Sequence, residues 1–85
     1  MYPMDADELR SLFRVITFGT DATRRALGTR MAAGASLEFV RVLGETILSD
    51  ESEELRDRCR QVLDVMAESG STDAAVLLVE LNAPV

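Results

Sequence analysis

Apolar residues recur three and four positions apart in successive segments of this chain, and this spacing constrains the fold more than any other feature. The clearest segment runs from Asp50 to Glu68. Its regularly spaced apolar residues are Leu55, Cys59, Val62, Leu63 and Met66. Residues at this spacing share one face of an α-helix, and another element has to cover that face. The pattern therefore predicts amphipathic helices that pack against one another.

Start and stop signals divide the chain into four to five helices. Glycines end three of the segments, and Asp5, Ser36 and Asp50 are suitable N-caps. The predicted helices run from Asp5 to about Phe18, from Thr20 or Asp21 to about Ala33, from Ser36 to Leu48, from Asp50 to Glu68, and from about Asp73, capped by Ser71 or Thr72, to Leu81. We expect a compact all-α array, orthogonal or bundle-like, that forms a single helical domain over residues 1–85.

The second helix has the weakest pattern of the five. Ala22, Ala26, Leu27 and Met31 form only a thin apolar stripe. Gly28 lies within it and weakens the helix by about 1 kcal/mol relative to Ala.

The fifth helix is unusual because residues 74–79 are apolar on every side. Such a segment is either buried on most sides or a strand, and no partner strand is evident. In the third helix, Phe39 and Val42 widen the apolar surface, and Gly44 predicts the close approach of a neighbouring helix. A chain this short buries only about 60–65% of its extended surface. We therefore expect a homodimer or an obligate partner; the alternative is a monomer with the fifth helix at its centre.

The residue types that are missing exclude several kinds of chemistry. The chain has no His, no Lys and one Cys. It cannot supply the histidine of a nucleophilic triad, a Schiff-base lysine or the usual four ligands of structural zinc. We expect a protein that is not an enzyme and that binds no cofactor and no metal. Cys59 is expected to act as a small buried hydrophobic residue.

Charge is distributed unevenly along the chain, whose net charge is −6. Residues 1–44 contain six Arg and five acidic residues, whereas residues 45–85 contain three Arg and ten acidic residues. The acidic run at residues 50–54 lacks the ligand spacing of a calcium loop and is expected to be a charged helix start. An acidic N-terminus and the absence of a long apolar run predict a cytoplasmic protein that does not enter a membrane.

These features predict a small acidic module for protein–protein interaction. An adaptor, a secretion-chaperone-like protein or an inhibitor would each fit, with binding to a partner or to itself through an apolar helical face. The residues expected to form this face are Phe39, Val42, Val76, Val79 and Leu81.

The alternative hypothesis is a small DNA-binding regulator of the helix-turn-helix kind. It would use the cationic residues Arg24, Arg25, Arg30 and Arg41. The acidic net charge and the mainly apolar side chains of the would-be recognition helix argue against nucleic acid as the partner.

Overall fold

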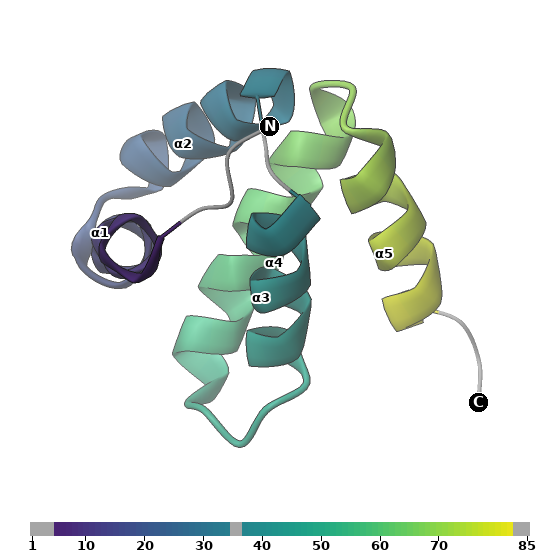
Figure 1. Cartoon of the computed structure of the whole chain (residues 1–85). Helices are drawn as coiled ribbons and strands as arrows, with labels where there is room; N and C mark the ends of the chain where they lie inside the picture. The colour runs from purple at the N-terminus through teal and green to yellow at the C-terminus, as the bar shows by residue number, and fades with distance from the viewer. Residues whose placement is uncertain (1–4, 35–36, 83–85) are drawn as a thin grey trace.

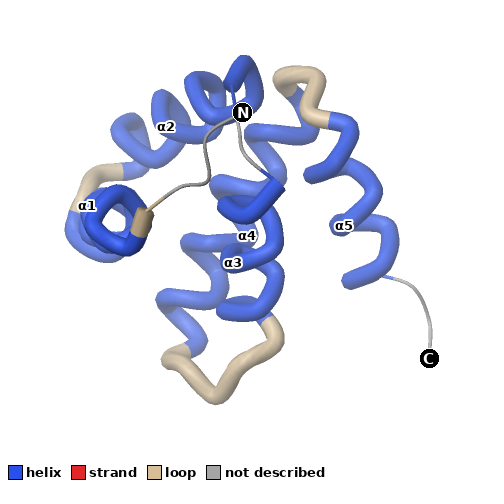
Figure 2. The backbone as a smooth tube through the Cα atoms, viewed as in Figure 1, coloured by secondary structure: helices blue, strands red, loops and turns tan. Residues whose placement is uncertain are grey.

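The computed structural model describes residues 5–34 and 37–82 (Figures 1 and 2). These residues form five α-helices and no strand, as the helical spacing of the apolar residues predicts. The helices are α1 (Ala6–Phe18), α2 (Asp21–Gly34), α3 (Leu37–Ile47), α4 (Glu53–Glu68) and α5 (Thr72–Asn82). The radius of gyration is 11.9 Å. A compact domain of this length is expected to have a radius of about 12 Å. The prediction of a compact all-α array is confirmed.

Side-chain caps begin the helices close to the predicted positions. Asp5 Oδ1 accepts a hydrogen bond from the backbone N–H of Glu8 at 2.8 Å and so caps α1. The Ser71 hydroxyl accepts one from the N–H of Ala74 at 3.2 Å at the start of α5. The predicted cap of the third helix, Ser36, lies outside the described residues.

The predicted N-cap of α4 is wrong by two residues. Ser52, rather than Asp50, is the N-cap, because its hydroxyl accepts a hydrogen bond from the N–H of Leu55 at 3.2 Å. Asp50 belongs to the preceding turn, in which the Ser49 hydroxyl donates to the carbonyl of Thr46 at 2.6 Å. Two possible caps close together in the sequence thus compete, and the turn geometry selects the second.

α4 is the central helix of the fold and contacts all four of the others (Figure 1). Four of its side chains are fully buried: Cys59, Val62, Leu63 and Met66. Ile16 of α1 and Phe39 and Leu43 of α3 are the other large side chains that are fully buried in the described residues. The position of α4 excludes the alternative in which the fifth helix is central. Ala74 is the one fully buried residue of α5, so this helix lies at the edge.

Two glycines mark the places where helices approach most closely. A Cβ atom on Gly28 would lie 2.7 Å from Val65 Cβ, so α2 is pressed against α4 at this point. A Cβ atom on Gly44 would lie 2.8 Å from Leu77 Cδ2, which confirms the expected close approach of a helix to α3. The predicted stripe of α2 was partly wrong, because Ala22 and Ala26 are exposed. α2 instead turns Arg24, Leu27 and Gly28 inward.

α3 and α5 run side by side in the same direction, and α4 runs in the opposite direction (Figure 1). Gly44 near the end of α3 meets Leu77 in the middle of α5, and residues from the first turns of both helices also lie together. This arrangement creates a shared outer surface on the side of α5 away from α4.

Candidate protein-binding face

A shallow groove lies between α3 and α5, and we call it the α3–α5 groove. Its volume is about 260 Å³. The residues that line it are Leu37, Val40, Arg41, Asp73, Val76, Leu77 and Glu80. Val40 and Leu77 are buried or half-buried, whereas the side chains of Leu37 and Val76 are 61% and 53% exposed. The groove therefore has an apolar floor and exposed aliphatic groups above it.

The apolar surface continues beyond the groove along α5. Val79 is 71% exposed and follows Val76 by three residues, which is the spacing of neighbours on one helix face. Leu48, the first residue after α3, is 75% exposed as well. Exposed aliphatic residues thus lie on α3, on α5 and in the turn that follows α3.

The structure brings only part of the predicted binding set to this face. Val76 and Val79 are exposed, whereas Val42 and Leu81 are half-buried, and Leu81 packs against the core. The prediction that Phe39 lies at the surface is wrong, because its side chain is 0% exposed. Phe39 precedes the buried Leu43 by four residues, so helical geometry points both of them towards the core.

Leu37 is an exposed residue of this face that the predicted binding set does not contain. Leu37, Arg41 and Glu45 recur at intervals of four, and this second periodicity on α3 marks an outer, exposed face.

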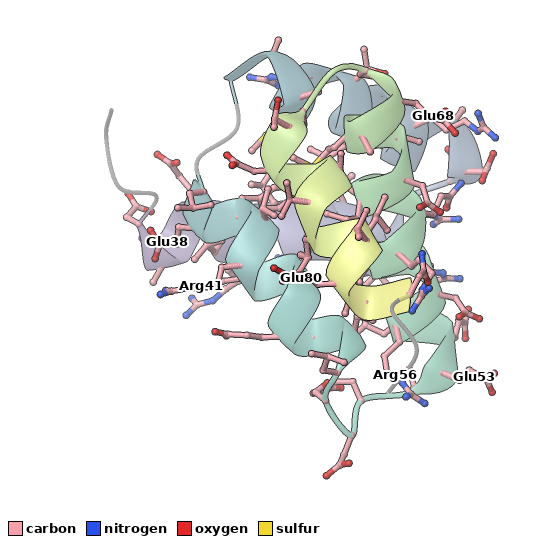
Figure 3. The ribbon with its side chains drawn as sticks, turned by 90° about the vertical axis from the view of Figure 1, so that its right-hand side faces the viewer. Glu38, Arg41, Glu53, Arg56, Glu68 and Glu80 are labelled. Carbon is pink, nitrogen blue, oxygen red and sulfur yellow. The ribbon has the colours of Figure 1, made fainter. Side chains whose placement is uncertain are left out.

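Charged groups of both signs form the rim of the α3–α5 groove (Figure 3). Arg41 stands on the α3 side, and its Nε lies 3.8 Å from Glu45 Oε1 in an exposed ion pair. Asp73 and Glu80 stand on the α5 side, and neither carboxylate forms an ion pair within the described residues. An exposed pair such as Arg41–Glu45 is weak, so Arg41 remains available to another carboxylate.

The four arginines proposed for nucleic acid have separate environments. Arg24 is buried, Arg25 pairs with Asp21 at 3.3 Å, Arg41 belongs to the rim of the α3–α5 groove, and Arg30 lines a different cavity. The prediction that Arg24 contacts phosphates is wrong, because its side chain is buried and its Nε and Nη1 donate hydrogen bonds within the protein.

Arg24 links three parts of the fold. Its Nε donates to Gln61 Oε1 at 2.8 Å, and its Nη1 donates to the carbonyl of Gly19 at 2.7 Å. Gln61 in turn donates to Asp21, and this hydrogen bond is the main cause of the lowered pKa of the Asp21 carboxyl. The network therefore ties the start of α2 to α4 and to the end of α1.

Arg58 of α4 supports the end of α1 in the same way. Its Nη1 donates to the carbonyl of Thr17, and its Nη2 pairs with Glu54. α1 has no basic residue in its last turn, and Gly19 is extended, with φ −77°, rather than left-handed. Guanidinium groups from two other helices therefore satisfy carbonyls at this helix end and complement its dipole.

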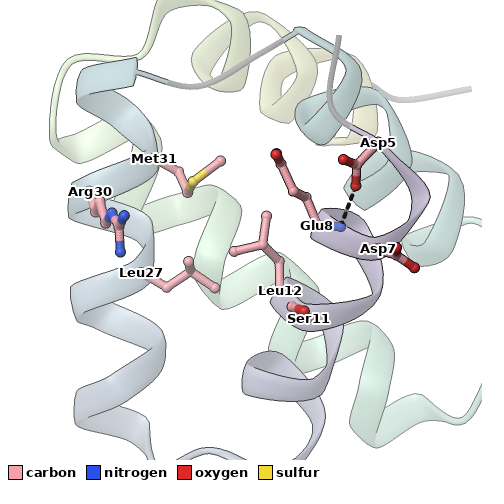
Figure 4. A pocket seen from close by; sticks show the side chains of 8 residues that line it. All are labelled: Asp5, Asp7, Glu8, Ser11, Leu12, Leu27, Arg30 and Met31. Atoms are coloured by element: carbon pink, nitrogen blue, oxygen red, sulfur yellow. Dashed lines mark hydrogen bonds between the residues drawn. The ribbon is translucent and has the colours of Figure 1, made fainter. Parts of the chain in front are cut away.

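A second cavity, of about 520 Å³, lies between α1 and α2 (Figure 4). Leu12, Leu27 and Met31 give it an apolar side, and Asp5, Asp7, Glu8, Ser11 and Arg30 complete its lining. Two of these carboxylates already have partners on α1: Asp5 caps the helix, and Asp7 lies 3.8 Å from Arg10. Asp5 and Asp7 thus serve the local structure of α1.

Cys59 is fully buried in the core, as predicted. Burial raises the pKa of its thiol to about 11, so the reactive thiolate is scarce at neutral pH. Within residues 5–34 and 37–82, no three side chains of His, Cys, Asp or Glu are grouped so that they could hold a metal ion. None of the helices in the same ranges has the length and apolar character needed to cross a membrane.

Comparisons with protein families, curated proteins and solved structures find no match for this chain. A functional proposal therefore rests on the geometry and chemistry of its own surface.

Proposed function

We propose that this protein is a non-enzymatic interaction module that binds a protein surface through the α3–α5 groove and the adjoining outer face of α5. The observation that carries the proposal is the exposure of Leu37, Val76 and Val79 on two adjacent helices. Full burial of an aliphatic side chain of this size contributes about 1.5–3 kcal/mol, so covering the three together is a substantial driving force.

The distribution of polarity supports the same proposal. The centre of the face is aliphatic, and charges stand at its edge, as in many protein interfaces. A helix or a helical hairpin of a partner is the element best suited to a groove between two parallel helices. Adaptor, secretion-chaperone-like and inhibitor roles all use such a face. We propose a cytoplasmic location, because the chain has a single cysteine and so does not have the disulfide framework that is typical of small secreted domains.

Tagged purification from a lysate of the native cells tests the proposal. Val76→Asp and Val79→Asp each put a charge at the centre of the face, and we expect either change to abolish assembly or partner recovery. Phe18→Asp is the matched control, because Phe18 is 81% exposed but belongs to α1, which packs against α2 and α4. Unchanged assembly of the two valine variants would contradict the proposal.

No observation in the described residues favours the DNA-binding alternative. The same purification addresses it through nucleic-acid staining of the eluate. Nucleic acid that is released by moderate salt and lost in Arg25→Ala would replace the present proposal.

A further inference from the structure

We propose that the occupant of the α3–α5 groove is a second copy of this chain, related to the first by a two-fold axis that runs along the groove. This inference rests on the proposed function and names the partner for the same face.

The parallel course of α3 and α5 makes such a dimer possible. A two-fold axis parallel to both helices leaves their direction unchanged and exchanges their sides. α3 of each copy then faces α5 of the other, at the same level along the groove. A closed two-fold dimer uses one patch twice, so each contact occurs in duplicate.

The charges of the rim match across this axis. Arg41 and Glu80 line the same groove from opposite sides, on α3 and α5 respectively (Figure 3). The axis therefore places Arg41 of each copy opposite Glu80 of the other. A two-fold axis perpendicular to the groove and passing through Arg41 would instead place Arg41 of one copy against Arg41 of the other. Repulsion between the two like charges disfavours that arrangement.

The aliphatic groups match in the same way. Leu37 on α3 lines the groove together with Asp73 and Val76 of α5. The proposed axis brings Leu37 of each copy over Val76 of the other. The interface would thus cover two of the large aliphatic groups that the monomer leaves exposed, once from each copy.

The rim also favours a second copy over a basic protein. The chain carries a net charge of −6, which in general attracts cationic partners. The groove is not uniformly acidic, because Arg41 lines it together with the carboxylates of Asp73 and Glu80. A partner that fits has to present an acid to Arg41 and a cation to the facing carboxylate, and another copy of this surface does both.

Sedimentation equilibrium of the purified chain over a concentration series tests the proposal. We expect the wild type to reach twice the chain mass of 9.3 kDa. Arg41→Glu and Glu80→Arg should each raise the dimer dissociation constant by about tenfold or more, because each turns two attractive contacts into two repulsive ones. Glu68→Arg makes the same charge change at the end of α4 and should leave the constant unchanged.

Mixing the two charge variants gives the decisive result. Arg41→Glu carries two acids at these positions and Glu80→Arg carries two cations, so an equimolar mixture should form a heterodimer with both contacts restored. Circular dichroism of each variant confirms its helical fold. A contact within one chain cannot produce this rescue, so failure to recover the dimer in the mixture overturns the proposal.

The outcomes also separate this inference from the proposed function. A wild type that stays monomeric throughout overturns the second-copy proposal. If Val79→Asp nevertheless abolishes recovery of a different protein, the interaction-module proposal stands. If Val76→Asp, at a residue that both proposals use, changes neither self-association nor partner recovery, both proposals fail.

Discussion

At the residue scale, Arg24 shows how a charged side chain can serve as a core residue. Its guanidinium donates to Gln61 and Gly19, so the charge is buried only with its hydrogen bonds made. We expect Arg24→Met to lower the free energy of unfolding by about 1–3 kcal/mol, because the buried acceptors lose their donor. Urea denaturation measures the change. Arg25→Met, next to it but exposed, should stay within about 0.5 kcal/mol of the wild type.

Cys59 gives a prediction about pH. Burial raises the pKa of its thiol from 9.0 to about 11. Its contribution to stability is complete below pH 9, and it falls as pH rises towards 11, because the unfolded chain loses the proton first. We expect a loss of about 1–3 kcal/mol over this interval.

Urea denaturation at a series of pH values measures this loss, and Cys59→Ala is the control. The alanine variant is less stable overall but lacks this titration. If it shows the same decline between pH 9 and pH 11, the thiol is not its cause.

At the scale of helices, the close contact at Gly28 overrides helix propensity. Alanine is favoured over glycine in a helix by about 1 kcal/mol. A Cβ at Gly28 would nevertheless lie 2.7 Å from Val65 Cβ, which is fixed to the backbone of α4 and cannot swing aside. We expect Gly28→Ala to destabilise the protein by about 1–3 kcal/mol, since α2 has to move away from α4.

Thermal unfolding followed by circular dichroism measures this effect. Gly34→Ala is the matched control, because nothing lies within 4 Å of a Cβ at that position in α2. A stabilised Gly28→Ala variant would show that α2 and α4 are less tightly packed than the structure has them.

The helices could be predicted because their signals are local. The apolar spacing and the caps of α1 and α5 depend on residues within a few positions of each other. The centre of the fold could not be predicted in this way. Residues 74–79 are more apolar than any part of α4, yet α5 lies at the edge of the fold. α4 is central because it is the longer helix, carries five buried residues and contacts all four of the other helices.

The candidate face was predictable only in part, for a related reason. Val76 and Val79 were identified because α5 has more apolar residues than one side can bury. The prediction for Phe39 is wrong because α3 has apolar residues on two sides, and the packing of α4 against α3 decides which side is buried. The burial of Arg24 could not be predicted, because its acceptors are distant in the sequence. Gln61 is 37 residues away and Gly19 is five residues away, and only the fold brings both to the guanidinium group.

At the scale of the whole molecule, charge and apolar area act together. The rim pair proposed between copies is exposed at its edge, so ions weaken it, whereas burial of the aliphatic groups does not depend on ionic strength in this way. We expect the difference in self-association between the wild type and Arg41→Glu to shrink as salt is raised. Sedimentation equilibrium in dilute and in concentrated sodium chloride measures it. A difference that does not change with salt would indicate that Arg41 acts through packing alone.

The guanidinium groups of Arg24 and Arg58 at the end of α1 affect how the molecule unfolds. Carbonyls of Thr17 and Gly19 are satisfied by side chains that arrive from α4 and α2. Separating α1 from the remainder would break these bonds and also uncover the core around Ile16, while Arg24 would keep only its bond to Gln61. We therefore expect the chain to melt in one all-or-none step over its five short helices in the described residues.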